Sequence, residues 1–120
     1  MNPHEKGQAR EDMAVAYLES KGYTISDRNF RCAFGEIDII ANKEGMLIFV
    51  EVKYRKNART QHPLASVGPK KQEKISRCAL YYMYRHKLPE DTPCRFDVIS
   101  ILGDEISHFR DAFPFYPVRS

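Results

Sequence analysis

The segment GEIDIIANKEGMLIFVEVKYR, residues 35–55, constrains the fold of this chain more than any other part of the sequence. It contains two runs rich in Ile, Val and Phe, residues 36–41 and 46–54, which predict two β-strands joined by a turn at residues 42–45. A connection this short predicts an antiparallel hairpin. Charged side chains are depleted from strands, so Asp38, Glu51 and Lys53 each need a specific physical reason for their positions.

The register of this hairpin decides which charged side chains meet. A four-residue turn pairs Ala41 with Met46 and therefore places Asp38 opposite Phe49. In this register Asp38 and Glu51 form a diagonal pair with backbones about 7–8 Å apart, so that their carboxylates can converge. The same face also carries Glu36, opposite Glu51, and Lys53.

Two converging carboxylates repel each other unless one binds a proton or a cation lies between them. Mg²⁺ and Mn²⁺ prefer such oxygen ligands, and Mg²⁺ is commonly held by one or two carboxylates together with water and substrate phosphates. The pair therefore predicts a divalent-metal site for phosphodiester chemistry, where the Lys53 ammonium would orient water or stabilise a phosphate oxygen. The competing interpretation is a solvated strand face with cross-strand ion pairs, which is the commoner role of a lone Glu-x-Lys.

Hydrophobic residues surround these charges on both faces of the predicted hairpin, which favours a partly covered site. One predicted core face consists of Ile37, Ile39, Val50 and Val52. The other face is also apolar and contains Ile40, Leu47 and Phe49.

The remaining elements predict a single domain, residues 1–120, of the mixed α/β class. Apolar periodicity predicts helices over Gln8–Lys21 and from Pro69 to about His86. Strands are expected at Tyr23–Phe30, Arg95–Leu102 and Glu105–Phe109, which gives the order αβββαββ. Residues 1–7 and 112–120 are expected to be flexible or packing tails. The aromatic part of the second tail, 113–117, either caps the core or forms an interface that allows a homodimer.

Further charged residues extend the predicted site. Glu11 begins an apolar helix stripe and is a candidate for a water-mediated metal ligand, although the helix dipole also favours an acid early in a helix. The net charge is only +3, but basic residues cluster after Lys53 and in the second helix. This clustering predicts phosphate-backbone contacts, with a solvated basic face as the alternative. The predicted nucleic-acid contacts are Arg55, Lys56, Arg59, Lys70, Lys71 and Lys74.

Several classes of protein are disfavoured. The three cysteines, Cys32, Cys78 and Cys94, are widely spaced without a CxxC pair, which argues against a disulfide framework and a zinc site and suits a reducing cytoplasm. The N-terminal residues do not resemble a secretory signal, and no apolar run approaches membrane-spanning length. Asp97 shares a predicted strand face with Ile99 and is expected to form structural hydrogen bonds.

The segments REDMAVAYLESKGY, RNFR, GEIDIIA, FVEVKYR, SVGPKKQEKISRCA and RFDVI resemble the bacterial YraN-like (UPF0102) family. That family in turn resembles archaeal Holliday-junction resolvases of the PD-(D/E)xK nuclease superfamily. The resemblance implies a restriction-endonuclease-like core, in which Asp38, Glu51 and Lys53 occupy the D and E-x-K positions and Glu11 the helical acidic position. Ile37 stands where the superfamily label has proline.

Together, the residues and the resemblance predict a cytoplasmic Mg²⁺- or Mn²⁺-dependent endonuclease acting on structured or branched DNA. The metal would be held by Asp38, Glu51, Glu11 and the Val52 carbonyl. The alternative prediction is a catalytically silent module that binds nucleic acid or assembles with protein while retaining the nuclease fold.

Overall fold

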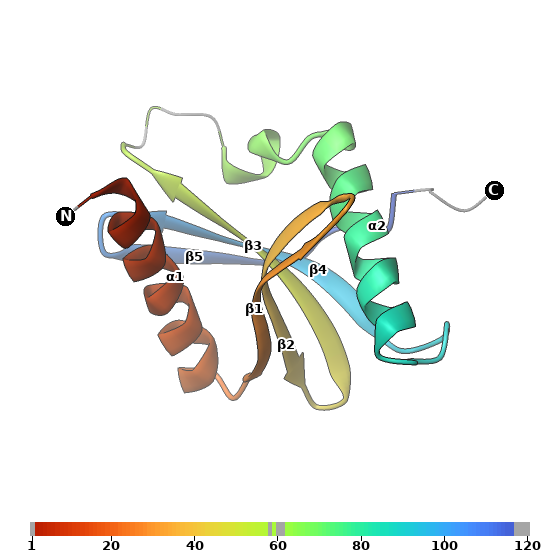
Figure 1. Cartoon of the computed structure of the whole chain (residues 1–120). Helices are drawn as coiled ribbons and strands as arrows, with labels where there is room; N and C mark the ends of the chain where they lie inside the picture. Colours follow the sequence, from red (N-terminus) through yellow and green to blue (C-terminus); the bar gives the residue numbers. More distant parts are fainter. Residues whose placement is uncertain (1, 58, 60–61, 117–120) are drawn as a thin grey trace.

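A computed structural model describes residues 2–57, 59 and 62–116 of the chain. Its elements are α1 (Pro3–Ser20), β1 (Thr24–Cys32), β2 (Gly35–Lys43), β3 (Met46–Arg55), the 3₁₀ turn η1 (Pro63–Ser66), α2 (Pro69–Arg85), β4 (Cys94–Leu102) and β5 (Glu105–Phe113). The strands form one sheet in the order β1-β2-β3-β4-β5, in which β3 and β4 are parallel and the other neighbours antiparallel (Figure 1). The predicted mixed α/β class and the order αβββαββ are confirmed.

Helix α1 begins five residues earlier than predicted, at Pro3 instead of Gln8. Asn2 caps it, because the Asn2 side chain accepts a hydrogen bond from the Glu5 N–H (2.9 Å) while the Glu5 carboxylate accepts one from the Asn2 N–H (3.3 Å). Residues 3–7, predicted to belong to a tail, therefore form the first turns of the helix. The sequence HEKGQ has no apolar periodicity, which is why the pattern of hydrophobic residues did not reveal this part of the helix.

The β2–β3 hairpin has a two-residue turn, and the predicted register was wrong. Glu44 and Gly45 both have positive φ (52° and 81°), as a type I′ turn requires, and Lys43 pairs with Met46. Ile40, not Asp38, lies opposite Phe49. The pairing is shifted by two residues from the prediction, and a shift of two keeps the paired residues, 39–43 and 46–50, on their predicted faces.

Both faces of the sheet are covered, each by one helix (Figure 1). Leu18 of α1 packs with Ile39 and Val50 on one face. On the other face, α2 packs against Ile40 and Phe49. These two clusters explain why β2 and β3 are apolar on both sides.

Ile37 departs from the predicted face. It packs in the α2 cluster although Ile39 packs in the α1 cluster. The last pair between β2 and β3 is Ile39 with Val50, and the preceding part of β2 pairs with β1 alone. Strand β1 spans Thr24–Cys32 instead of the predicted Tyr23–Phe30, and its end contacts α2, where the Cys32 and Cys78 sulfurs lie 2.8 Å apart as free thiols.

Asp97 has the structural role predicted for it. Its fully buried carboxylate accepts hydrogen bonds from Arg95 Nε (2.9 Å), His108 Nε2 (2.7 Å) and the Asp111 N–H (2.9 Å). Burial would raise the pKa of Asp97, but the hydrogen bonds from His108, Arg95 and the Asp111 backbone outweigh it and hold the pKa below its ordinary value. Arg95 is thereby paired with Asp97.

The C-terminal aromatic residues cap the core. Strand β5 extends to Phe113, beyond the predicted end at Phe109, and the Phe113 ring stacks on Phe96 with centroids 5.0 Å apart. Phe115 contacts the same ring at 4.7 Å, and the Tyr116 N–H donates to the Ser76 hydroxyl (2.9 Å). Of the two predicted roles for residues 113–117, the structure has the packing role for 113–116. Residues 117–120 lie outside the described part.

No helix within the described residues is long and apolar enough to cross a bilayer.

Candidate metal and nucleic-acid site

The acid pair lies where β2 and β3 separate. Beyond the last backbone pair, Ile39 with Val50, the Asp38 carboxylate takes the place of the β2 backbone and accepts the Val52 N–H at 2.8 Å. The N–H and C=O of one strand residue point to the same side, so the Val52 carbonyl is also directed toward Asp38. The gap between the two strands is therefore lined by a carboxylate and a backbone carbonyl.

Glu51 completes the pair. Its side chain is buried, and its carboxyl group lies close enough to that of Asp38 for the two to interact directly. The predicted proximity of these two acids is thus present, although Asp38 lies just beyond the last β2–β3 pair, Ile39 with Val50, and not on the predicted diagonal. Glu36, predicted to face Glu51, instead pairs with Arg31 at 2.9 Å.

The electrostatics of the pair favour a bound positive charge or proton. Burial and then the nearby Glu51 carboxylate raise the pKa of Asp38 to about 7, and the Val52 N–H only partly opposes this rise. The raised pKa of Asp38 means that the charged form of this carboxyl group is disfavoured where it lies. A divalent cation would neutralise the pair, and two carboxylate oxygens with a carbonyl fit the oxygen ligands that Mg²⁺ and Mn²⁺ prefer.

Two lysines reach Glu51 from different elements. Lys53 Nζ lies 3.6 Å from Glu51 Oε1, and Lys71 Nζ, from the first turn of α2, lies 3.7 Å from the same oxygen. The sequence predicted Lys53 on this strand face and Lys71 as a nucleic-acid contact, but it did not predict the contact of Lys71 with Glu51. Both ammonium groups remain partly exposed, with 26% and 42% of their side chains accessible, so each can contact a substrate.

Glu11 lies near the pair but is held by β1. Its carboxylate accepts a hydrogen bond from Asn29 Nδ2 (2.9 Å), and Arg28 Nη2 is 3.7 Å away. Burial raises the pKa of Glu11, the Asn29 hydrogen bond lowers it, and Asp38 raises it again, so the two acids influence each other. Within residues 2–57, 59 and 62–116, no three His, Cys, Asp or Glu side chains form a metal-binding group, and Glu11 therefore does not join the pair as a third ligand.

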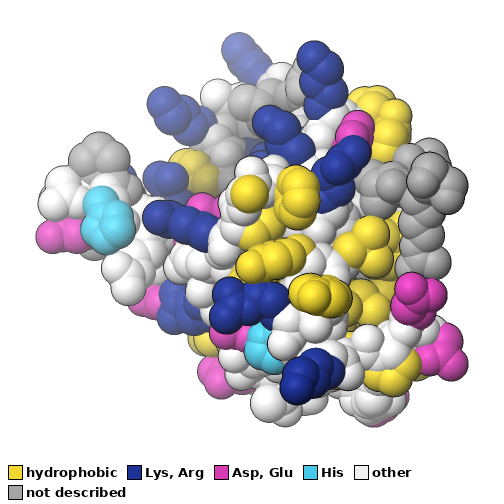
Figure 2. All heavy atoms as spheres, turned by 45° about the vertical axis from the view of Figure 1, so that its right-hand side comes forward, with side chains coloured by type: hydrophobic (Ala, Val, Ile, Leu, Met, Phe, Trp, Pro, Cys, Tyr) yellow, Lys and Arg dark blue, Asp and Glu magenta, His cyan; other side chains and the backbone are white. Residues whose placement is uncertain are grey.

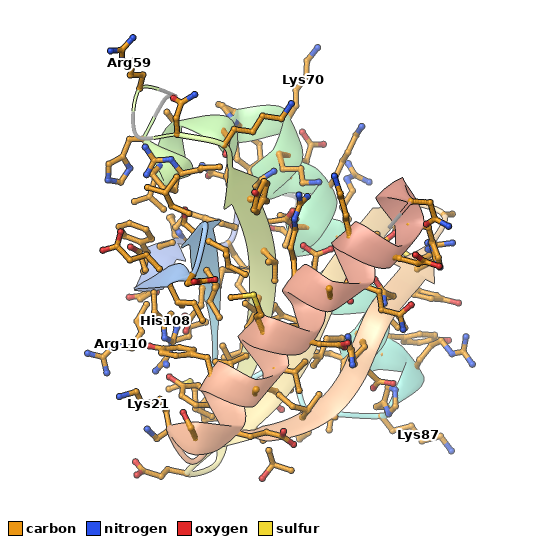
Figure 3. All side chains as sticks on the ribbon, turned by 90° about the vertical axis from the view of Figure 1, so that its left-hand side faces the viewer. Lys21, Arg59, Lys70, Lys87, His108 and Arg110 are labelled. Carbon is orange, nitrogen blue, oxygen red and sulfur yellow. The ribbon has the colours of Figure 1, made fainter. Side chains whose placement is uncertain are left out.

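Basic grooves flank the site. One, of about 480 Å³, follows the end of β3 and is lined by Lys53, Tyr54, Arg55, Lys56, Asn57, Pro63 and Ser66. Another, of about 310 Å³, runs beside α2 and is lined by Phe34, Lys70, Glu73, Lys74 and Arg77. Figure 2 shows Lys and Arg side chains gathered over the upper part of this face, and in Figure 3 Arg59 and Lys70 extend outward at the same end.

Two exposed aromatic side chains in these grooves each have an arginine side chain close to the ring. The Arg10 guanidinium lies 3.2 Å from the centre of the Tyr54 ring, and that of Arg77 lies 5.8 Å from the Phe34 ring. Phe34 and Tyr54 are 42% and 40% exposed. Phe34 was not predicted as a site residue, because its only signal in the sequence is an aromatic residue beside Gly35.

Comparisons with known proteins place this chain in a family. Residues 10–101 match the family described as "Uncharacterised protein family UPF0102". A UPF0102 protein of Lachnoclostridium phytofermentans is 46% identical over 116 residues, which cover 97% of this chain and 98% of that protein. One from Clostridioides difficile is 48% identical over 115 residues (94% and 100%), and one from Neisseria gonorrhoeae is 46% identical over 101 residues (84% and 87%). The chain belongs to the UPF0102 family.

Proposed function

We propose that this protein is a Mg²⁺- or Mn²⁺-dependent endonuclease that hydrolyses phosphodiester bonds in structured or branched DNA. The observation that carries the proposal is the buried contact between Asp38 and Glu51, which leaves the pKa of Asp38 near 7. Perturbed acids of this kind gather at functional sites because folding alone gains nothing from placing two carboxylates together.

The residues of the pair have distinct tasks in this proposal. Asp38 and Glu51, with the Val52 carbonyl, would hold the ion, and Glu11 would act only through water, since Asn29 and Arg28 already hold its carboxylate. The bound ion would supply positive charge to the scissile phosphate and lower the pKa of a water. Lys53 would orient the attacking water, because its ammonium lies beside Glu51 on the same strand face.

The substrate is held by positive charge on both sides of the acid pair. Lys71 contacts Glu51 from α2 and would stabilise the charge on a phosphate oxygen. Arg55 and Lys56 line one groove, and Lys70 and Lys74 line the other, so a nucleic-acid backbone can follow both. Arg59 extends from the same end of the molecule (Figure 3).

Cleavage assays test this function directly. The wild-type protein is incubated with a four-way junction, a flap and a linear duplex in Mg²⁺, in Mn²⁺ and in EDTA. We expect cleavage that requires the metal and favours the branched substrates. Absence of cleavage of all substrates in both metals would contradict the enzymatic proposal.

A nucleic-acid-binding module without activity is the second candidate. The observation that favours it is the absence, among the described residues, of a third acidic ligand beside Asp38 and Glu51. The two candidates differ in their response to divalent ions. An active site binds Mn²⁺ at the pair when DNA is present, whereas a silent module binds DNA equally well with and without the ion.

Phe34 provides a prediction about substrate choice. We expect Phe34→Ala to weaken binding to branched or single-stranded DNA by about tenfold, because stacking of an unpaired base on an aromatic ring contributes about 1–3 kcal/mol. Affinity for a fully paired duplex should change little. Fluorescence anisotropy with labelled DNA measures both affinities.

Tyr84→Ala is the matched control for this variant. Tyr84 is the most exposed large aromatic residue of the described chain, at 80%, but it lies near the end of α2, away from both grooves. Equal losses of affinity for Phe34→Ala and Tyr84→Ala would show that Phe34 has no specific contact with an unpaired base.

A further inference from the structure

A further basic pocket, separate from the two grooves beside the acid pair, lies at the C-terminal end of α1. It has a volume of about 250 Å³ and is formed where the end of α1, the end of β2 and strand β5 meet. Figure 3 shows Lys21, His108 and Arg110 close together beside the lower end of α1, whereas Lys70 and Arg59 lie at the top of the molecule. The lining residues are Tyr17, Lys21, Tyr23, Lys43, His108 and Arg110.

The rim of the pocket consists of three cations. Among the residues that the structure describes, no acidic side chain forms an ion pair with Lys21, Lys43 or Arg110. Two of them lie over aromatic rings, with Lys43 Nζ 4.8 Å from the centre of the Tyr23 ring and Lys21 Nζ 5.9 Å from that of Tyr17. Three like charges around one hollow repel each other, and an anion between them would relieve that repulsion.

The floor of the pocket is a fixed hydrogen-bond chain. The buried Asp97 carboxylate accepts from His108 Nε2 (2.7 Å), so in the neutral ring Nδ1 is the acceptor for the Tyr17 hydroxyl (3.1 Å). Arg95 donates to both Asp97 and the Tyr23 hydroxyl (2.8 Å). The negative charge of Asp97 is therefore already paired with Arg95 and His108, and it does not neutralise the cations at the rim.

We propose that this pocket binds a phosphate group. Phosphate carries up to two negative charges and several acceptor oxygens, which suit the three cations of the rim better than a single carboxylate does. The proposal stands independently of the acid pair and its metal. The phosphate can come from a nucleic-acid backbone or from a free phosphate or nucleotide.

The pocket lies at a distance from the acid pair. Lys43 and Asp38 are five residues apart on β2, which corresponds to about 17 Å along the strand at about 3.4 Å per residue.

The test uses the double variant Lys43→Ala/Arg110→Ala in the full chain, beside wild type and Lys87→Ala. Lys87 is an exposed cation on the opposite side of the molecule and serves as the matched control (Figure 3). NMR titrations with inorganic phosphate and with adenosine 5′-monophosphate follow the ring signals of His108. Fluorescence anisotropy with a duplex at several salt concentrations measures nucleic-acid affinity, and thermal unfolding verifies that each variant folds.

Each arm has a defined expectation. We expect phosphate to shift the His108 signals in wild type and in Lys87→Ala, and the double variant to lose about tenfold or more in phosphate affinity. If the source is nucleic acid, the double variant also reduces the salt dependence of duplex binding by about two phosphate contacts. If the source is a free phosphate, duplex binding is unchanged.

One result overturns the proposal. If the three cations only offset the carbonyl end of α1 and remain solvated, phosphate will shift no His108 signal in wild type, and duplex affinity and salt dependence will be the same in the double variant and in Lys87→Ala.

Discussion

Glu51→Gln is expected to reduce DNA cleavage by about a thousandfold or more, while DNA affinity stays within about threefold of wild type. Glutamine keeps the shape of the side chain but removes the charge that lies between Asp38, Lys53 and Lys71. The metal site loses half of its acidic charge, and both lysines lose the carboxylate that positions them. Binding survives because the basic residues along the grooves are unchanged.

Single-turnover cleavage of a branched substrate and anisotropy with the same DNA measure the two effects separately. Glu73→Gln is the matched control, since it removes an acid that lines the neighbouring groove and pairs with Arg77, not with the site. Full activity of Glu51→Gln, or equal loss of activity in both variants, would refute the role assigned to Glu51.

Asp38→Asn is expected to stabilise the metal-free protein at pH 8 by up to about 4 kcal/mol. Folding raises the pKa of Asp38 from 3.8 to about 7, chiefly through burial and then through repulsion by Glu51. Asparagine is neutral, and its side-chain oxygen can still accept the Val52 N–H. The charged Asp38 carboxylate therefore lowers the free energy of unfolding of the wild-type protein at pH 8, and Asp38→Asn removes this unfavourable contribution.

The pH dependence has a definite sign. Between about pH 4 and pH 7 the folded protein keeps the Asp38 proton while the unfolded chain releases it, so the contribution of Asp38 to the free energy of unfolding falls as pH rises through this window. Below that window, Asp38 is protonated in both states and wild type resembles the variant. Above pH 7 the full difference is present, and Mg²⁺ should restore stability to wild type more than to Asp38→Asn.

Urea unfolding at pH 4, 6 and 8, with and without Mg²⁺, measures this dependence. Asp104→Asn, at the exposed β4–β5 turn, is the control for loss of one negative charge. A difference between wild type and Asp38→Asn that is the same at all three pH values would contradict the raised pKa of Asp38.

The acid pair was predictable from the sequence because strand alternation survives an error in register. The predicted turn had four residues, since a Glu-Gly pair is a weaker type I′ signal than Asn-Gly, and the true two-residue turn shifts the pairing by two positions. Because side chains alternate with a period of two, the paired residues keep their predicted faces, and Asp38, just beyond the last pair, still reaches Glu51. Lys71 was predicted as a nucleic-acid contact from the basic residues of the second helix, but not as a partner of Glu51.

Features that depend on packing between distant segments were not predictable in this way. The contact of Cys32 with Cys78 and the pocket around His108 join elements far apart in the chain. No local spacing signals either of them. Phe34 lies between β1 and β2, where its ring is 42% exposed and has the Arg77 guanidinium of α2 beside it. The sequence alone shows only an aromatic residue beside a glycine.

Diffraction from crystals grown with Mn²⁺ above pH 7, recorded where manganese scatters anomalously, tests the central claim most directly. We expect one anomalous peak between the carboxylates of Asp38 and Glu51, within coordination distance of both, and its loss in an Asp38→Asn/Glu51→Gln crystal. A wild-type crystal in which the two carboxyl groups remain hydrogen-bonded to each other, with Mn²⁺ absent from the gap or bound elsewhere, would contradict the account.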